Sequence, residues 1–415
     1  MCALSAPEIT HADRHPRALI LVRNTASHDS RVTREVQVLE RIGFDVLVAG
    51  VVSTGERRRH ATINGAELVR IDPLRGLRRP RRNARVGAGP SDPGRASGPG
   101  ESTARDRRSR LRRLAVTASY HVRATALAVR QAPALVHAND YNTMWIALLA
   151  KLLRRSRVVY DSHELWPDRN GRPEWRPWLL ACEALFVRAA DATITTSPGY
   201  ADAIARRYRV ARPTVVRNIP VQGLVEPLAA ADAALAVYVG GLMPGRGLEQ
   251  GIEALARVPG ARMALIGPGD ANYLTGLRTL AERVGVADRI EIRPPVRLED
   301  VVAAVSGASF GLLLIQPVCR SYELTLPNKL FEYAVAGVPM LASDLPVIGG
   351  VVREHGLGEA VGASDVREIA AAMRRLLEPE LNRRIRERVR AFAQRETWEH
   401  ERDVLAGVYR ATGPS

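Results

Sequence analysis

The segment 316–344 constrains the fold of this chain more than any other part of its sequence. An apolar strand ends at Gln316, and a helix then begins behind Pro327, whose fixed φ suits a first helical turn. The helix ends at Gly337, and a second apolar strand follows at 339–343. This order of strand, loop, helix and strand predicts a parallel βαβ unit, whose functional edge lies at the carboxyl ends of the strands. We therefore expect the first turn of this helix to face a ligand.

Two charged residues fall at the start of that helix. Lys329 can meet a phosphate that the helix N-terminus already favours, and Glu332 can accept two hydrogen bonds from a vicinal diol such as a ribose. The chain has only two lysines, Lys151 and Lys329, among 60 basic residues. Because arginine serves almost everywhere else, a lysine indicates a position that needs a compact ammonium. The alternative for Lys329 is an ordinary solvated position in a first helical turn.

Length and composition indicate a globular protein of two domains. The chain has 415 residues, of which 46% are hydrophobic and 25% are charged, as in soluble α/β proteins. Its three cysteines show no CxxC spacing, so neither a disulfide framework nor a zinc site is expected. The N-terminus lacks the apolar core of a signal peptide, and the best apolar run, 144–153, is too short to span a membrane. We expect a cytoplasmic protein.

Most of the net charge of +16 lies in one segment, 75–113, where 13 arginines face three acidic residues, a net of +10. The arginines alternate with glycine and proline, so the segment cannot bury apolar area and is expected to be a disordered insertion. It has no interleaved aromatic residues for base stacking, so we expect no nucleic acid partner. Weak association with an anionic membrane surface, peripheral to its inner face, is a better expectation. The role expected first for this segment is that of a solvated tether.

The N-terminal half alternates between strands and helices in the order of a Rossmann domain. Its first exit loop, 24–30, holds no glycine, so the dinucleotide fingerprint is absent. A polar residue, His163, follows the strand 157–160 and is placed to contact a sugar hydroxyl or a developing charge. The alternative is a histidine that fixes its own loop beside Asp161 and Glu164. The predicted strands are 18–23, 45–52, 67–72, 134–137, 157–160, 192–196 and 214–217, and the predicted helices are 31–42, 111–130, 145–153, 178–190 and 198–208.

The C-terminal half opens with a strand, 236–240, followed by a glycine-rich loop and a helix from Leu248. Glycines 240, 241, 245 and 247 let the backbone approach a ligand closely, and Arg246 can bind a phosphate there. A second glycine loop, with Gly267 and Gly269, follows the strand 263–266. Further strands are predicted at 290–292 and 310–315, and further helices at 365–377, 381–392 and 397–409. Together with Lys329 and Glu332, these loops predict a pocket for a nucleoside diphosphate.

The chain resembles members of glycosyltransferase family 4. The resemblance rests on five segments in this order: VVYDSHE (158–164), VVRNIP (215–220), YVGGLMPGRGLEQGIEAL (238–255), LIGPG (265–269) and LPNKLFEYAVAGVPMLASD (326–344). It implies an α/β protein of the GT-B fold, in which two Rossmann-like domains with parallel sheets face each other and a C-terminal helix crosses back to the first domain. The implied domains are 1–220 on the acceptor side, a linker at 221–234, a donor domain at 235–395 and the returning helix at 396–415.

The resemblance also implies a chemistry. Members of the family retain the anomeric configuration of a sugar that they transfer from a nucleoside diphosphate, and they need neither a metal nor a cofactor. The chain has no Asp-x-Asp motif, which fits a metal-free site. The implied catalytic residues are His163, Glu323 and Lys329. The implied donor-binding residues are Gly240, Gly241, Arg246, Gly267, Leu326, Asn328, Lys329 and Glu332, and the acceptor-side residues are Asn24, Ser30 and Asp140.

This sequence departs from the family pattern at two positions. The family often has a glutamate eight residues before Glu332, where this chain has Leu324, with Glu323 one residue out of register. The first basic residue of the family's glycine loop matches Gly241, which leaves Arg246 to serve the second position. Phosphate binding is therefore expected to depend more on Lys329.

The predicted function is that of a retaining glycosyltransferase with an unassigned acceptor: a glycan, a lipid or a small molecule. Two alternatives stay open. A nucleotide-sugar epimerase or hydrolase of the same fold would isomerise or hydrolyse the donor without an acceptor. A catalytically silent scaffold subunit would bind nucleotide and transfer nothing.

Overall fold

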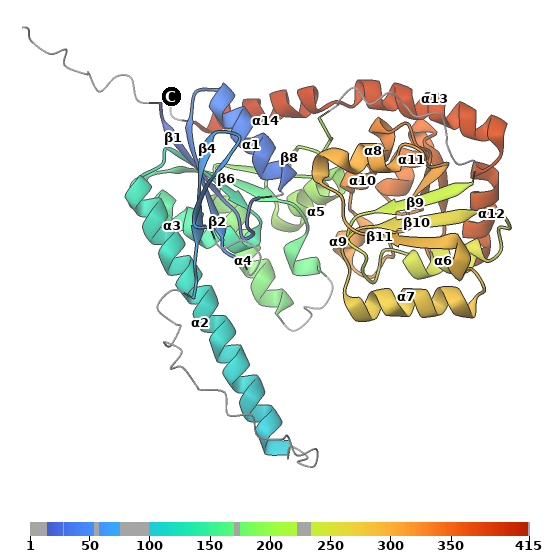
Figure 1. The fold of residues 1–415 in the computed structure, drawn as a ribbon. Helices are drawn as coiled ribbons and strands as arrows, with labels where there is room; N and C mark the ends of the chain where they lie inside the picture. The colour runs from blue at the N-terminus through green and yellow to red at the C-terminus, as the bar shows by residue number, and fades with distance from the viewer. Residues whose placement is uncertain are drawn as a thin grey trace, which may run out of the picture. The chain divides into compact units, whose positions relative to one another are not determined.

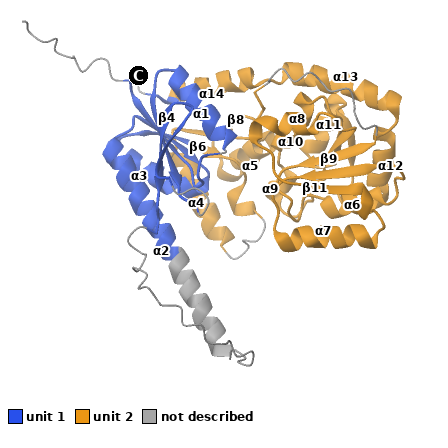
Figure 2. Cartoon of the chain, viewed as in Figure 1, with its two compact units in different colours: residues 1–159, 412–415 blue, residues 160–411 orange. Residues whose placement is uncertain are grey.

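The computed structural model describes residues 15–27, 29–53, 58–74, 99–169, 175–221 and 234–413, with side chains omitted for 99–113. The first part of the expected insertion, 75–98, and most of the expected linker lie outside these residues. The chain forms two compact units, Met1–Val159 with Thr412–Ser415 and Tyr160–Ala411 (Figure 2). The division falls within one strand.

The first sheet has eight strands in the order β3-β4-β2-β1-β5-β6-β7-β8. Strands β1, β2, β4 and β5 pair in parallel, as do β7 and β8, whereas β3 runs antiparallel to β4. The parallel strands confirm the predicted Rossmann-like arrangement. The bounds are β1 Arg17–Leu21, β2 Asp45–Val51, β3 His60–Ile63, β4 Ala66–Ile71, β5 Leu135–Asn139, β6 Arg157–Ser162, β7 Ala192–Thr195 and β8 Thr214–Val215.

Local sequence signals explain how two elements of this sheet begin. Helix α1, Ser30–Arg41, starts behind Asp29, whose carboxylate accepts hydrogen bonds from the backbone N–H groups of Arg31 and Val32. Strand β3 was not predicted. It joins β4 through Asn64 and Gly65, which have φ of 48° and 96°, as two-residue hairpin turns require.

Helix α2, Pro99–Gln131, begins well before the predicted start at Leu111. The expectation of a disordered loop is therefore wrong for 99–113. The reason lies in the composition of this stretch, because arginine, alanine and glutamate are good helix formers when no glycine or proline separates them. The expectation of disorder rested on glycines and prolines interleaved with the arginines, and within this segment these residues end at Gly100. Helix α3, Met144–Arg154, packs against α2.

The second sheet is entirely parallel, with the order β11-β10-β9-β12-β13-β14. Its strand order reverses between β9 and β12, and ligands of open parallel sheets bind at the carboxyl end of such a switch point. Figure 1 shows this sheet covered by α6 and α7 on one side and by α8, α10 and α11 on the other. The strands are β9 Leu235–Val239, β10 Arg262–Ile266, β11 Ile290–Arg293, β12 Phe310–Leu313, β13 Met340–Ser343 and β14 Gly358–Val361.

Helix α10, Asn328–Val335, is held against the switch point by one aromatic residue. The ring of Tyr333 lies over Gly311 of β12, where an added Cβ would stand 2.5 Å from it. The Tyr333 hydroxyl donates to the carbonyls of Val237 and Leu312 and accepts from the backbone N–H of Val239. Lys329 lies one turn earlier on the same face of the helix. Packing thus places Lys329 at the carboxyl end of β9.

The other helices of the second unit come both from the part of the chain before β9 and from the part after it. They are α4 Arg176–Ala189, α5 Pro198–Tyr208, α6 Leu248–Leu255, α7 Ala271–Arg283, α8 Val301–Val305, α9 Arg320–Glu323, α11 Ile348–His355, α12 Val366–Leu376, α13 Pro379–Arg395 and α14 Trp398–Thr412. Glu401 of α14 accepts two hydrogen bonds from the Arg217 side chain and one from its backbone N–H, just after β8. Among the described residues, no helix combines the length and the apolar character that a bilayer crossing requires.

Candidate functional site

Glycine loops close the carboxyl ends of β9 and β10. Gly240, Gly245, Gly247 and Gly267 all have positive φ, from 70° to 148°. An added Cβ at Gly267 would stand 2.0 Å from the Gly240 carbonyl oxygen, and one at Gly247 would stand 2.1 Å from the Leu314 carbonyl oxygen. These loops therefore pack backbone on backbone, which only glycine permits.

Lys329 extends into this glycine framework. An added Cβ at Gly240 would stand 2.9 Å from the Lys329 ammonium, which lies 5.0 Å from the centre of the Tyr238 ring. The pKa of Lys329 is lowered to about 8, mainly by burial and also by the charge of Arg246, whereas the Glu332 carboxylate acts to raise it. A desolvated ammonium gains most when an anion arrives, because the anion replaces the solvation that the ammonium has lost.

Arg246 and two tyrosines complete the cationic side of this site. The Arg246 guanidinium lies 4.7 Å from the centre of the Tyr322 ring, a cation–π contact. The Tyr238 hydroxyl donates a 2.9 Å hydrogen bond to the Gly241 carbonyl, and burial raises the pKa of Tyr238 to about 12. Sequence reasoning missed both tyrosines, because a tyrosine inside a strand or a short helix carries no motif.

The other predicted donor residues lie along the start of α10. Asn328 is its first residue and is exposed, while Glu332 is partly buried one turn further on. The Leu326 side chain is 7% exposed and packs in the core of the second sheet.

Glu323 lies in a segment that the sequence predicted as loop but that forms the short helix α9. Its carboxylate accepts a 2.7 Å hydrogen bond from Arg320, which is half exposed. Two hydrogen bonds from α5 hold this segment: the Ser197 hydroxyl donates to the Leu324 carbonyl at 2.5 Å, and the Tyr200 hydroxyl donates to the Ser321 carbonyl at 2.8 Å. The position of Glu323 is thus fixed by backbone contacts on both sides of it.

His163 follows β6, as predicted. Its Nε2 lies 3.2 Å from a carboxylate oxygen of Asp161, which is fully buried, and its own side chain is 23% exposed. The Thr196 hydroxyl donates to the His163 carbonyl at 3.0 Å. The ring is therefore oriented by a buried carboxylate and keeps a solvent-accessible edge, an arrangement that suits both a structural and a catalytic role.

Three predicted residues lie in the first unit, at the exits of β1 and β5. Asn24 donates a 2.7 Å hydrogen bond to Asp29, and its own side-chain oxygen accepts one from the backbone of Ala26. Ser30 is the first residue of α1, whose cap is Asp29. Asp140 has a φ of 63° and precedes a 3-10 turn, Tyr141–Thr143. The order of the first sheet reverses between β1 and β5, so these residues mark its switch point.

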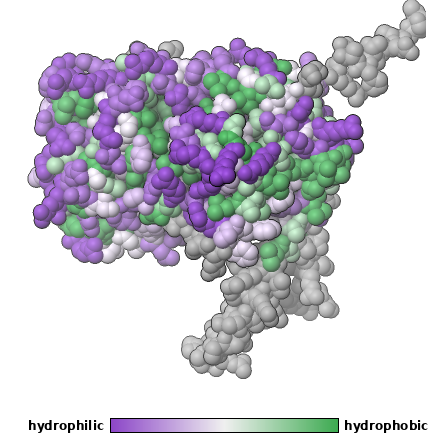
Figure 3. All heavy atoms as spheres, turned by 180° about the vertical axis from the view of Figure 1, so that it is seen from behind, coloured by the Kyte–Doolittle hydropathy of each residue, from purple (hydrophilic) through white to green (hydrophobic). Residues whose placement is uncertain are grey.

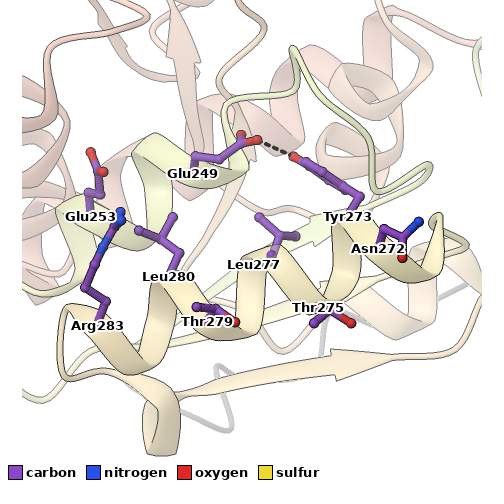
Figure 4. Close-up of a pocket in the computed structure, with 10 residues that line it drawn as sticks. Glu249, Glu253, Asn272, Tyr273, Thr275, Leu277, Thr279, Leu280 and Arg283 are labelled. Atoms are coloured by element: carbon purple, nitrogen blue, oxygen red, sulfur yellow. Dashed lines mark hydrogen bonds between the residues drawn. The ribbon is translucent and has the colours of Figure 1, made fainter.

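A separate open groove of about 670 Å³ lies between α6 and α7 (Figure 4). At one end the Tyr273 hydroxyl donates a 2.8 Å hydrogen bond to Glu249. Leu277 and Leu280 line the groove, and both pack in the core of the second sheet. None of the residues predicted for the site lines this groove.

Comparison with known proteins identifies two matching family models. The model of Glycosyltransferase Family 4 matches residues 31–219, and that of Glycosyl transferases group 1 matches residues 233–379. Together the two models cover most of the chain, and they meet in the stretch where the linker was expected.

Similar curated proteins include D-inositol 3-phosphate glycosyltransferases. The protein from Streptomyces avermitilis is 26% identical over 308 residues, which cover 67% of this chain and 65% of the relative. That from Mycobacterium marinum is 27% identical over 179 residues, or 42% of this chain and 37% of the relative. The chain thus matches from about one third to two thirds of the length of these relatives.

Solved structures of similar fold extend over nearly the whole chain. A sucrose-phosphate synthase from Thermosynechococcus elongatus superposes with a TM-score of 0.71 at 18% identity, covering 95% of this chain and 98% of the other. The Anabaena protein HepE, solved in complex with UDP, gives a TM-score of 0.68 at 15% identity and covers 95% and 100%. These likenesses confirm the predicted GT-B fold. With both family models matched in order along the chain, this protein belongs to glycosyltransferase family 4.

Proposed function

We propose that the protein transfers a sugar from a nucleoside diphosphate donor to an acceptor, with retention of anomeric configuration. One observation carries the proposal. The partly buried Lys329 ammonium lies against Gly240 at the switch point of the second sheet, and the charges of Arg246 and Glu332 both act on its pKa. A pair of cations beside a carboxylate suits a diphosphate that is joined to a ribose.

The proposed roles follow from the chemistry of each group. Lys329 and Arg246 stabilise the charge that develops on the departing diphosphate, and Glu332 accepts hydrogen bonds from the ribose hydroxyls. The glycine loops at 240, 241 and 267, with the Leu326 backbone and Asn328, surround the donor. His163 contacts the transferred sugar, and Glu323 lies beside it. Asn24, Ser30 and Asp140 bind the acceptor.

Retention fits a site that is designed to stabilise a leaving group. The departing phosphate remains on the face from which the acceptor attacks, so its oxygen can take the acceptor proton as the new bond forms. The oxygen of the acceptor bonds to the anomeric carbon, the bond from that carbon to the phosphate oxygen breaks, and the proton leaves on the diphosphate. No residue of the chain needs to act as a nucleophile in this sequence.

The test is a panel of UDP-, GDP- and ADP-sugars offered to the purified chain, starting with UDP-sugars because HepE was solved with UDP. One donor class is expected to raise the unfolding temperature. A donor at about a hundred times its dissociation constant stabilises a protein by about 2.7 kcal/mol. D-inositol 3-phosphate is the first acceptor to add, since the similar curated proteins are named for it. NMR coupling at the anomeric carbon of the product then checks retention.

The same panel separates the alternatives. Isomerised or hydrolysed donor in the absence of any acceptor would identify an epimerase or a hydrolase. Stabilisation by nucleotide with no turnover under any acceptor would identify a scaffold subunit. If no nucleotide or nucleotide sugar stabilises the protein, the donor site is assigned wrongly.

A further inference from the structure

Helix α3 exposes large apolar side chains to solvent. Leu149, Leu152 and Leu153 are 42%, 77% and 57% exposed, and Trp145 is 39% exposed. They recur at the spacing of one helix face, opposite the buried Met144, Ala147 and Ala150. A solvated helix of a globular protein normally carries polar residues on that face, so this one departs from the usual pattern.

Helix α2 has the same feature beside it. Leu114 and Val122 are 66% and 69% exposed, whereas Tyr120, Ala124 and Ala128 of the same helix are buried. The two helices pack against each other, α2 contacts β4 and α3 contacts β5. Their exposed sides therefore face the same way and form one surface, which we call the α2–α3 face. Its residues are Leu114, Val122, Trp145, Leu149, Leu152 and Leu153.

The charged residues around the α2–α3 face are mostly cations. Neither 114–131 nor 144–155 contains an aspartate or a glutamate, whereas both contain cations. These cations are Arg123, Arg130, Lys151, Arg154 and Arg155. The sequence immediately before this part of α2, residues 105–113, adds six arginines and one aspartate. Hydrophobic residues gather on the side of the molecule that carries α3 (Figure 3).

We propose that the α2–α3 face docks on an anionic phospholipid surface. Leucines that are exposed by half or more can enter the acyl boundary, a tryptophan at the edge suits the headgroup region, and a rim of arginines and one lysine attracts acidic headgroups. The long basic side chains can extend from this apolar surface to reach the headgroups. The proposal moves the expected membrane contact from the arginine-rich segment alone to a folded surface. It does not depend on the proposed donor site.

The face favours a lipid surface over a second copy of the chain. An interface between two identical copies would bring these cations together with no acidic residue from 114–131 or 144–155 to offset them. An anionic bilayer supplies the missing charge and the apolar phase at once.

Vesicle co-sedimentation of the full-length chain tests this proposal. We expect binding to phosphatidylglycerol/phosphatidylcholine vesicles, weaker binding as NaCl rises, and little binding to pure phosphatidylcholine. The variant Leu152→Gln/Leu153→Gln should bind anionic vesicles at least about tenfold more weakly, because the burial of both leucines in the bilayer is lost. The variant Arg123→Gln/Arg154→Gln should bind anionic vesicles more weakly, and its binding should depend less steeply on the NaCl concentration.

The matched control is Val296→Gln/Leu298→Gln, which alters two exposed apolar residues elsewhere, 38% and 45% exposed. It should bind like the unmodified chain, and circular dichroism should show all variants folded. Equal binding of the Leu152→Gln/Leu153→Gln variant overturns the proposal, and so does the absence of binding to anionic vesicles. A dimer that this variant dissociates, with no vesicle binding, would assign the face to a second copy and also overturn it. Donor turnover, measured without vesicles, tests the proposed function separately.

Discussion

The two sheets share a topology but close their switch points in different ways. At the second sheet, the exits of β9 and β10 consist of glycines with positive φ that lie backbone on backbone, with Lys329 against them. At the first sheet, the exit of β1 contains no glycine. There Asn24 and Asp29 hydrogen-bond to each other, and Ala26, an alanine, has a φ of 61°.

We infer the ligand chemistry of each edge from this difference. Glycine loops leave no side chains between a ligand and the backbone, and one cation lies against them, which suits a compact and highly charged group such as a diphosphate. Side chains that bond one another close the other edge and leave varied polar groups at its rim. Polar groups of this kind can hydrogen-bond the hydroxyls of an acceptor. One strand order can therefore carry two kinds of loop, and the loops make the difference between the edges.

The largest expected effect comes from Gly267→Ala. A Cβ there would collide with the Gly240 carbonyl, and its φ of 148° is strained for alanine. We expect a loss of about 3 kcal/mol or more in the free energy of unfolding, together with loss of donor binding. Denaturant titration measures the first quantity. Gly276→Ala is the matched control, because an added Cβ there meets nothing within 4 Å in helix α7. It should stabilise the protein by about 0.5–1 kcal/mol. Similar effects of the two substitutions would contradict the backbone packing described for the second edge.

The next effect is that of Lys329→Met. We expect kcat/KM for the donor to fall about a hundredfold or more, because the developing phosphate charge loses its buried cation. The unfolding temperature should not fall, since burying this ammonium is itself unfavourable. Lys151→Met changes the only other lysine of the chain and should leave donor kinetics unaltered. Normal turnover by the Lys329 variant would remove the distinction between the two edges.

The pH dependence should distinguish the edges at a smaller scale. The pKa of Lys329 is about 8 in the folded protein, below its usual value of 10.5. Donor affinity should therefore fall as pH rises past about 8, by at most about tenfold per pH unit. Without ligand the sign reverses. Between pH 8 and 10.5 the unfolded chain binds a proton that the folded chain does not, so this group makes stability rise with pH. Calorimetry on the unmodified chain and on Lys329→Met checks both trends, which the variant should lack. A variant that kept them would assign them to another group.

The smallest effect is expected at the first edge. Asp29→Ala removes the side-chain cap of α1 and should cost about 1 kcal/mol of stability without changing donor affinity. Asp270→Ala removes a cap of the same geometry from α7 and should cost a similar amount. Thermal unfolding and donor titration measure these quantities. If Asp29→Ala weakened donor binding as much as Lys329→Met does, the division of roles between the edges would be wrong.

The sequence predicted the parallel framework well because that framework depends on local signals. The unit from β12 through α10 to β13 appeared where an apolar run, Pro327 and Gly337 had placed it, and α5 matched its predicted bounds. A buried strand or a capped helix can be recognised from about ten consecutive residues of sequence. The switch points could not be read in this way, because strand order is decided by contacts between distant segments.

The errors have equally specific causes. Strand β3 was not predicted, although the pair Asn64 and Gly65 is typical of a two-residue hairpin turn. Helix α9 was expected as loop, since four residues show no periodicity. The tyrosines around Lys329 and Arg246 were missed because packing between β9, α9 and α10 brings them together. The motif predicted the cations Lys329 and Arg246, whereas tertiary packing brings the rings of Tyr238 and Tyr322 next to them.

The hydrogen bonds from α5 to the segment around Glu323 have a consequence for how this family member can vary. Their acceptors are the main-chain carbonyls of Ser321 and Leu324, so the hydrogen bonds themselves do not need particular side chains at those two positions. Both side chains are buried, so substitutions there still cost packing energy. Inserting or deleting a single residue would in addition move both carbonyls away from Ser197 and Tyr200. This link therefore constrains the length of the segment more than its residue identities.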